Sequence, residues 1–157
     1  MAKVLVIYTS ASGNTEKMAH LVADGAEKAG GDVTLKRVED TDPAELLDYD
    51  ATIIGSPTYY GAPAAPVRKL FDDSVKYHGQ LEGKVGAAFS SSANIGGGNE
   101  TTILTILQSM LIHGMVIRGN SKGDHYGPVS INAPDLRVEQ QCRELGRRTT
   151  ELADKMT

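Results

Sequence analysis

The sequence has almost no cysteine and no long apolar run. Cys142 is the single cysteine among 157 residues, which excludes an internal disulfide and a cysteine-rich metal site. No segment approaches the roughly 20 consecutive apolar residues of a membrane-spanning helix. The N-terminal residues lack the charged, apolar and cleavage regions of a signal peptide. We therefore expect a cytoplasmic protein with no membrane partner and no bound metal.

Concentrated positive charge is also missing. The formal net charge is -4, whereas a surface that binds nucleic acid is strongly basic. The one dense basic cluster is Arg143, Arg147 and Arg148, and glutamates are interleaved with it. This mixture predicts a solvated helix face, so we expect no nucleic-acid partner.

Length and composition are ordinary for one soluble domain. A chain of 157 residues can bury a sizeable core, and 40% hydrophobic with 23% charged residues is a typical balance. The sequence has no internal repeat and no low-complexity tract. We interpret residues 1–157 as a single domain.

Short apolar runs alternate with helical patterns, which is typical of βαβ units around a parallel sheet. The run KVLVIY is nearly all apolar, as expected for a strand covered on both faces. We expect five strands, at residues 3–8, 32–38, 51–55, 85–90 and 114–118. We expect about five helices, including residues 15–29, 67–75, 100–113 and a last helix that begins near Asp135. Cys142 lies on the apolar line of that last helix, which favours a core position.

These elements predict a doubly wound α/β fold, in which right-handed crossovers place helices on both faces of a five-stranded parallel sheet. Such sheets bind ligands beyond the carboxyl ends of their strands. Polar segments follow strands one, three and four, and we expect residues 56–63 and 119–134 to be irregular. The carboxyl edge is therefore where we expect a ligand.

The first loop, TSASGNT at residues 9–15, joins a buried strand to a helix. The start of a helix leaves backbone N–H groups unpaired, and its dipole favours an anion. Gly13 lets the backbone approach a ligand closely, and the hydroxyls of Ser10, Ser12 and Thr15 can donate further hydrogen bonds. The loop has no lysine or arginine, so neutral donors would hold a phosphate. An empty helix cap is the alternative for this loop alone.

Three other kinds of site are excluded by the same residues. A Walker loop requires Gly-Lys-Ser/Thr, and a dinucleotide fingerprint requires Gly-x-Gly-x-x-Gly after the first strand; the sequence has neither. A receiver-type acidic pocket needs carboxylates at the strand ends, and none ends strand one or three.

The second and third loops indicate a planar ring beside the phosphate. Residues 56–61, SPTYYG, place two tyrosines after the third strand, and tyrosine offers a stacking face and a hydroxyl. Residues 90–98, SSSANIGGG, are small, so their backbone N–H groups could bond a heterocycle. Surface tyrosines and a flexible turn are the alternatives for each loop alone. Their joint occurrence at one edge favours a ligand.

Together, these loops resemble those of the flavodoxin-like flavoproteins, and most closely the WrbA-type NAD(P)H:quinone oxidoreductases. The resemblance extends to Phe89-Ser90-Ser91 with Gly96-Gly97-Gly98 and Glu100, to His113-Gly114-Met115-Val116, and to Tyr126-Gly127. The chain is shorter than typical members of that family, chiefly between strands two and three. Its first loop is closer to the flavodoxin pattern Ser/Thr-x-Thr-Gly-x-Thr.

The resemblance implies strand order 2-1-3-4-5, FMN as cofactor, and a homodimer or homotetramer. The phosphate would be held by Ser10, Ala11, Ser12, Gly13, Asn14 and Thr15. The flavin ring and ribityl chain would be contacted by Pro57, Thr58, Tyr59, Tyr60, Gly61, Ser91, Ser92, Ala93, Asn94, Ile95, Gly96, Gly97 and Tyr126. His113 would lie close to the flavin and, with Tyr60, would form the catalytic face where an acceptor docks. A histidine that caps a helix end is the alternative for His113.

The activity that the resemblance implies is two-electron reduction of a quinone by NADH or NADPH through FMN, with no side-chain nucleophile. A flavodoxin-type electron carrier, whose partner is a redox protein, is the alternative. Such carriers are usually strongly acidic, and a net charge of -4 supports this weakly. The triple glycine and His113 favour the enzyme, and the short chain favours the carrier. A scaffold that has lost FMN is a third interpretation.

Overall fold

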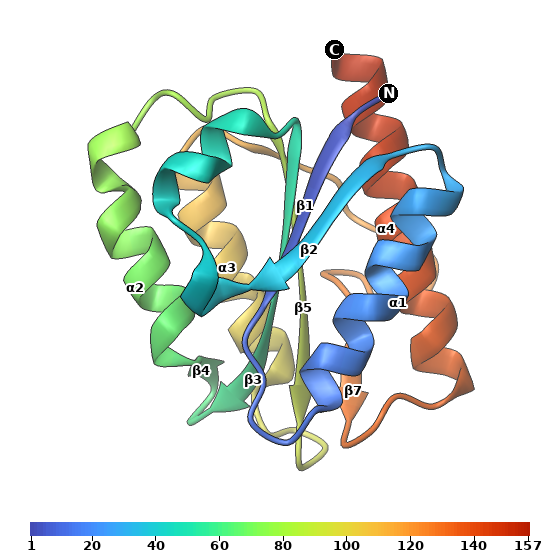
Figure 1. Cartoon of the computed structure of the whole chain (residues 1–157). Helices are drawn as coiled ribbons and strands as arrows, with labels where there is room; N and C mark the ends of the chain where they lie inside the picture. The colour runs from blue at the N-terminus through green and yellow to red at the C-terminus, as the bar shows by residue number, and fades with distance from the viewer.

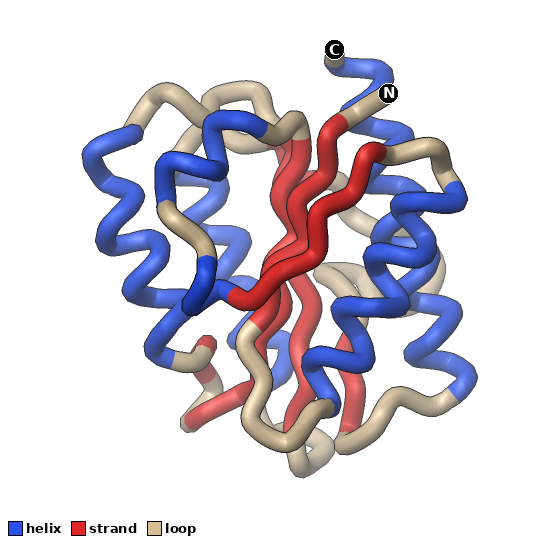
Figure 2. Tube along the Cα trace, in the orientation of Figure 1, coloured by secondary structure: helices blue, strands red, loops and turns tan.

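A computed structural model describes residues 1–157. Its central sheet has the strand order β2-β1-β3-β5-β6, with α1 and α4 on one face and α2 and α3 on the other (Figures 1 and 2). The strands are β1 (Lys3–Tyr8), β2 (Asp32–Arg37), β3 (Ala51–Tyr59), β4 (Ala62–Pro63), β5 (Val85–Ser92), β6 (Val116–Ile117) and β7 (Val129–Ile131). The α-helices are α1 (Asn14–Lys28), α2 (Ala65–Asp73), α3 (Asn99–Ile112) and α4 (Leu136–Met156). Short 3-10 helices are η1 (Val38–Asp40), η2 (Pro43–Asp48) and η3 (Ser74–Tyr77).

The five strands of the central path pair in parallel, in the predicted order 2-1-3-4-5. Their carboxyl ends meet at one edge, at the bottom of Figure 1, where the three polar loops lie. The predicted doubly wound α/β fold is therefore confirmed. No helix combines the length and the apolar character that crossing a membrane requires.

The sheet separates two apolar clusters. In β1, Val4 and Val6 pack with the cluster of α1 and α4, whereas Leu5 and Ile7 pack with the cluster of α2 and α3. Successive side chains of a strand point to opposite faces, so a strand covered on both sides is apolar throughout. Cys142 is fully buried in the first cluster, and burial raises the pKa of its thiol to about 12. Its predicted core position is confirmed.

The fifth strand position differs from the prediction. Residues 114–118 contribute only the two residues of β6, which pair with Val85 and Gly86 at the start of β5. The same edge is completed by β7, which pairs with Ser90, Ser91 and Ser92 at the other end of β5. The prediction that residues 119–134 are irregular was therefore wrong for β7, because its ladder partners lie far away in the sequence.

The bounds of several other elements also differ from the prediction. Strand β3 continues to Tyr59 and β5 to Ser92, so residues 56–63 form strands and a tight turn where an irregular loop was expected. Strand β2 ends at Arg37, one residue early, and there are four α-helices where about five were expected. The start of the last helix is confirmed, because Asp135 caps it by accepting the N–H of Val138 at 2.9 Å.

The basic cluster of α4 is only partly solvated. Arg143 pairs with Asp24, and Arg147 pairs with Glu144 and Glu151, all at the surface. Arg148 is 3% exposed, so the expectation of a solvated face was wrong for this residue. The inward face of α4 carries Cys142 and Leu145, and Arg148 follows three residues later on that face.

Helices α1 and α4 approach each other closely through two glycines. A Cβ on Gly25 would lie 2.0 Å from the carbonyl oxygen of Arg143, and a Cβ on Gly146 would lie 2.0 Å from that of Val22. Neither contact leaves room for a methyl group, so glycine is required by packing at both positions. This contact fixes α1, whose first turn follows the loop at residues 9–13.

We expect Gly146→Ala to lower the free energy of unfolding by about 1–3 kcal/mol, since the added methyl group must push α1 and α4 apart. Alanine favours a helix by itself, so a loss isolates the effect of packing. Gly119→Ala is the control, because a Cβ there meets no atom within 4 Å. Urea denaturation measures both variants, and equal stability of the two would contradict the packing argument.

Candidate functional site

The first loop presents a row of unpaired backbone donors. Helix α1 begins at Asn14 without a side-chain cap, after Gly13 in the left-handed region (φ 94°). Ser10 Oγ accepts the N–H groups of Gly13 (3.1 Å) and Glu16 (3.4 Å). No protein group accepts the remaining backbone N–H groups of the loop, which are those of Ser10, Ala11, Ser12, Asn14 and Thr15. The space beside Gly13 is open. Donors around an open space at a helix start form a cradle for an anion such as phosphate.

The first and third loops meet through their hydroxyl groups. Thr15 is buried in the first turn of α1, and its Oγ1 lies 2.8 Å from Ser91 Oγ at the end of β5. Strand β1 is joined to β5 through β3, so this hydrogen bond links polar groups across neighbouring strand ends. The cradle and the third loop therefore form one surface.

The second loop is a two-residue hairpin that displays Tyr60. Tyr59 pairs with Ala62 in the antiparallel contact of β3 with β4. The two residues between them, Tyr60 (φ 51°) and Gly61 (φ 75°), both lie in the left-handed region, as a type I′ turn requires. Tyrosine rarely adopts this conformation. The Tyr60 side chain is fully exposed and that of Tyr59 is half-exposed, so both rings are free to contact a ligand.

The second loop is attached to the third by hydroxyls and by a close glycine contact. Thr58 Oγ1 lies 2.9 Å from Ser90 Oγ, and Thr101 Oγ1 donates to the Gly61 carbonyl at 2.7 Å. A Cβ on Gly98 would lie 2.4 Å from Gly61 Cα, so only glycine fits there. The tyrosine hairpin is thus fixed to the start of α3.

The third loop supplies a second set of free donors. Ser92 Oγ donates to the Asn94 carbonyl at 3.0 Å and accepts from Asn99 Nδ2 at 3.2 Å, which closes the loop. The Gly97 N–H donates to the Asn94 carbonyl at 3.2 Å, whereas the N–H groups of residues 93–96 have no protein acceptor. Tyr126 is exposed, and it precedes β7, which borders the end of β5.

Two charged residues beside the first loop were missed at the sequence level. Thr9 Oγ1 donates to Glu39, and Glu39 pairs with Arg37 at 3.3 Å. Arg37 Nη2 also donates to the Ser10 carbonyl at 3.3 Å. Burial raises the pKa of Glu39, but the hydrogen bond from Thr9 and the neighbouring Arg37 outweigh it, so the pKa stays below its usual value. Glu39 is therefore ionised at neutral pH.

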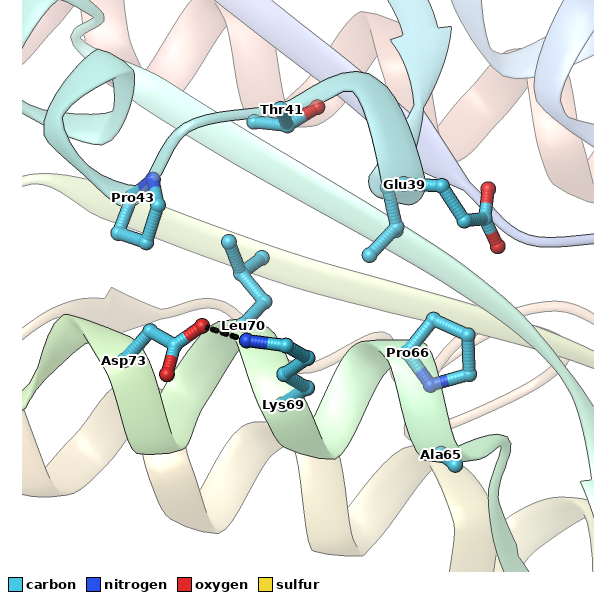
Figure 3. A pocket seen from close by; sticks show the side chains of 9 residues that line it. Glu39, Thr41, Pro43, Ala65, Pro66, Lys69, Leu70 and Asp73 are labelled. Atoms are coloured by element: carbon cyan, nitrogen blue, oxygen red, sulfur yellow. Dashed lines mark hydrogen bonds and ion pairs between the residues drawn. The ribbon is translucent and has the colours of Figure 1, made fainter.

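A separate cavity of about 440 Å³ lies between residues 38–43 and α2 (Figure 3). Leu70 lies between its two walls, and Lys69 pairs with Asp73 on the α2 side. Glu39 borders this cavity, but Figure 3 shows its carboxylate directed away from the centre, and that group accepts from Thr9. No residue of the three loops lines the cavity. No group of histidine, cysteine and acidic side chains is arranged to hold a metal ion.

His113 is not brought to this edge. Helix α3 starts at the carboxyl edge, and its 14 residues span about 21 Å, at about 1.5 Å per residue. His113 follows its last residue, and the neighbouring Gly114 carbonyl accepts from Gly83, close to the start of β5. The expectation that His113 contacts a flavin at the loops is therefore wrong for a single chain.

His113 has a structural role at the opposite edge. Its side chain is 6% exposed, and Nε2 lies 2.8 Å from Ser74 Oγ. Ser74 Oγ also donates to the Phe71 carbonyl at 2.7 Å, and the tautomer with its proton on Nε2 satisfies both contacts. Nδ1 has no partner. Burial, and then the nearby His78, lower the pKa of His113, so the ring is neutral at pH 7.

A pH titration of stability tests this assignment. The folded pKa of His113 lies below its ordinary value of 6.5, so the stability that the neutral ring contributes is complete above 6.5 and is lost as the pH falls below it. We expect the melting temperature of wild type to fall more steeply below pH 6.5 than that of His113→Gln, which keeps a donor for Ser74. Exposed His20→Gln should retain the wild-type slope. A slope unchanged by His113→Gln would refute the assignment.

Comparisons with known proteins agree with this geometry. The family model described as Flavodoxin matches residues 6–101, which include all three loops. A protein of Archaeoglobus fulgidus named NAD(P)H dehydrogenase (quinone) is 36% identical, with 99% of this chain and 100% of that protein covered. A protein of Aquifex aeolicus named flavodoxin is 40% identical over 96% of this chain and 86% of its own length.

The fold is also found among solved structures. The crystal structure described as a flavodoxin, WrbA-like protein from Agrobacterium tumefaciens superposes with a TM-score of 0.85 at 28% identity, and both chains are covered completely. The matched segment includes the start of α1 and the third loop, where the unpaired donors lie. The chain belongs to the flavodoxin family.

Proposed function

We propose that the protein is an FMN-dependent oxidoreductase that transfers two electrons from NADH or NADPH to a quinone. The observation that carries this proposal is two sets of unpaired N–H donors, at residues 10–12, 14 and 15 and at residues 93–96. They follow β1 and β5, which lie on either side of β3 and its two exposed tyrosines. The relative named NAD(P)H dehydrogenase (quinone), which aligns over its whole length, supports the reaction.

The residues fit the phosphate end of FMN. A phosphate needs several convergent donors; five N–H groups of the first loop have no protein acceptor, and the space beside Gly13 is open. The exposed Ser12 and half-buried Asn14 can add side-chain donors. Ser10 and Thr15 already bond within the protein and would shape the cradle.

The residues also fit a flavin ring. Tyr59 and Tyr60 offer exposed ring faces for stacking. Pro57 and Thr58 hold the hairpin in the sheet, and the N–H groups of residues 93–96 can donate to the ring oxygens and nitrogens. We propose that Ser91 and Ser92 border the ring from the end of β5 and Gly97 from the third loop, and that Tyr126 closes the outer side.

Bound FMN supplies the redox chemistry by accepting a hydride and releasing two electrons. The chain's own residues bind and orient it. Tyr60 and Tyr59 would leave one ring face open to a nicotinamide and then to a quinone. His113 takes no part within one chain, because it lies at the other edge of the sheet. A homodimer or homotetramer stays a prediction.

A flavodoxin-type electron carrier is the second candidate. The relative named flavodoxin, which matches 96% of this chain at 40% identity, favours it. In that case the exposed tyrosine hairpin would meet a redox protein in place of a quinone.

Reduction of the bound flavin separates the two candidates. We expect the purified protein to be yellow, to release FMN on denaturation, and to lose its yellow colour under anaerobic NADH or NADPH. Benzoquinone should then restore the colour. If neither nicotinamide bleaches the flavin, the carrier is correct. A colourless protein that does not bind added FMN would refute both candidates.

Tyr60→Asn tests the hairpin. Asparagine tolerates the left-handed conformation better than tyrosine, so the melting temperature should stay equal or rise. Loss of the aromatic face should weaken binding of FMN and of riboflavin alike, by about threefold to tenfold. Quenching of flavin fluorescence measures both dissociation constants. Unchanged affinity for both ligands would exclude Tyr60 as a ring contact.

A further inference from the structure

The first loop contains no cation, yet Arg37 reaches it from the next strand. Tyr8 pairs with Arg37 in the parallel register of β1 and β2, so the last residue of β2 lies beside the loop. The guanidinium lies 5.6 Å from the centre of the Tyr8 ring, and Nη2 donates to the Ser10 carbonyl at 3.3 Å. Lys17, in the first turn of α1, borders a different surface pocket with His20.

The bond to Ser10 has a consequence for the donors of the loop. In a trans peptide the C=O and N–H groups point in opposite directions. A carbonyl of Ser10 held by Arg37 therefore turns the N–H of Ala11 the other way, and this N–H is among the unpaired donors. Arg37 thus fixes the orientation of a peptide group in the cradle.

The carboxylates around the loop give the positive charge of Arg37 a second role. Glu39 accepts from Thr9, and Glu16 accepts from the Tyr8 hydroxyl at 2.6 Å. Two carboxylates therefore lie beside a loop that would receive a phosphate dianion, and each would repel it. Arg37 is the one cation that bonds both to the loop and to one of these carboxylates. A neutral residue at position 37 would leave the Glu39 carboxylate without its ion-pair partner.

We propose that Arg37 is a positioning residue that makes the loop select the phosphorylated flavin over unphosphorylated riboflavin. This rests on the FMN site of the proposed function. Arg37 acts through the Ser10 peptide and through its charge, without contact to the flavin ring. The Arg37 side chain is 42% exposed, so part of its electrostatic effect is open to screening by salt.

Ligand selectivity tests the proposal without any measurement of activity. Dissociation constants for FMN and for riboflavin are measured by fluorescence quenching, at low and at high salt, for wild type, Arg37→Met and Arg37→Lys. We expect Arg37→Met to weaken FMN binding by about tenfold or more, to change riboflavin binding little, and to reduce the salt dependence of FMN binding. Arg37→Lys, which keeps the charge, should retain most of the selectivity. Arg68→Met, at an exposed position of α2, is the control.

Equal weakening of FMN and riboflavin would show a merely structural role and overturn the proposal, as would an unchanged FMN affinity. Circular dichroism confirms that each variant folds; if Arg37→Met does not, Arg37→Gln replaces it, since it also removes the charge. A wild-type protein that binds neither ligand would refute the proposed function itself, and this outcome is distinct from a failure of Arg37.

Discussion

The position of helix α1 is the constraint on which the site depends. Its first turn carries two of the unpaired N–H groups and follows directly on the other three, and a shift of that turn would separate them from the third loop. Two contacts hold it. Gly25 and Gly146 bring α1 and α4 together at backbone distance, and Thr15 bonds to Ser91 across the strand ends. The packing of α1 against α4 therefore positions the first loop, and the hydrogen bond from Thr15 to Ser91 holds α1 to the end of β5.

The strands and the three loops could be predicted from the sequence because apolar runs and loop composition are local signals, whereas the strand order came from the family resemblance. The run KVLVIY and the TSASGNT loop needed no distant partner to be interpreted. Strand β7 could not be found in the same way, since Ser130 lies in a strand only through its pairing with Ser91. Arg37 was missed because its relation to Ser10 comes from the register of two strands.

From the sequence, His113 was expected at the carboxyl edge of the sheet, and the topology of the fold shows why this was wrong. A helix that leaves the carboxyl edge of a parallel sheet must return to the amino edge before the next strand starts. A residue between α3 and β6 is therefore at the edge opposite the loops, whatever its chemistry. Arg148 was misplaced for a different reason. Its charge predicts an exposed position, but it lies on the buried face of α4.

The edge of the sheet beside β5 is assembled from two separate pieces, β6 at one end and β7 at the other. Strands β6 and β7 pair with β5 independently of each other, so their pairing does not fix the length of the chain that joins them. Within this connection Asp124 pairs with Arg137 of α4, and Gly127 packs against Ala88 of β5, so only the exposed turn at residues 121–123 can lengthen without moving the core or the ligand edge. This connection is the place where the fold could accept an inserted segment, and where related chains of different length can share one architecture.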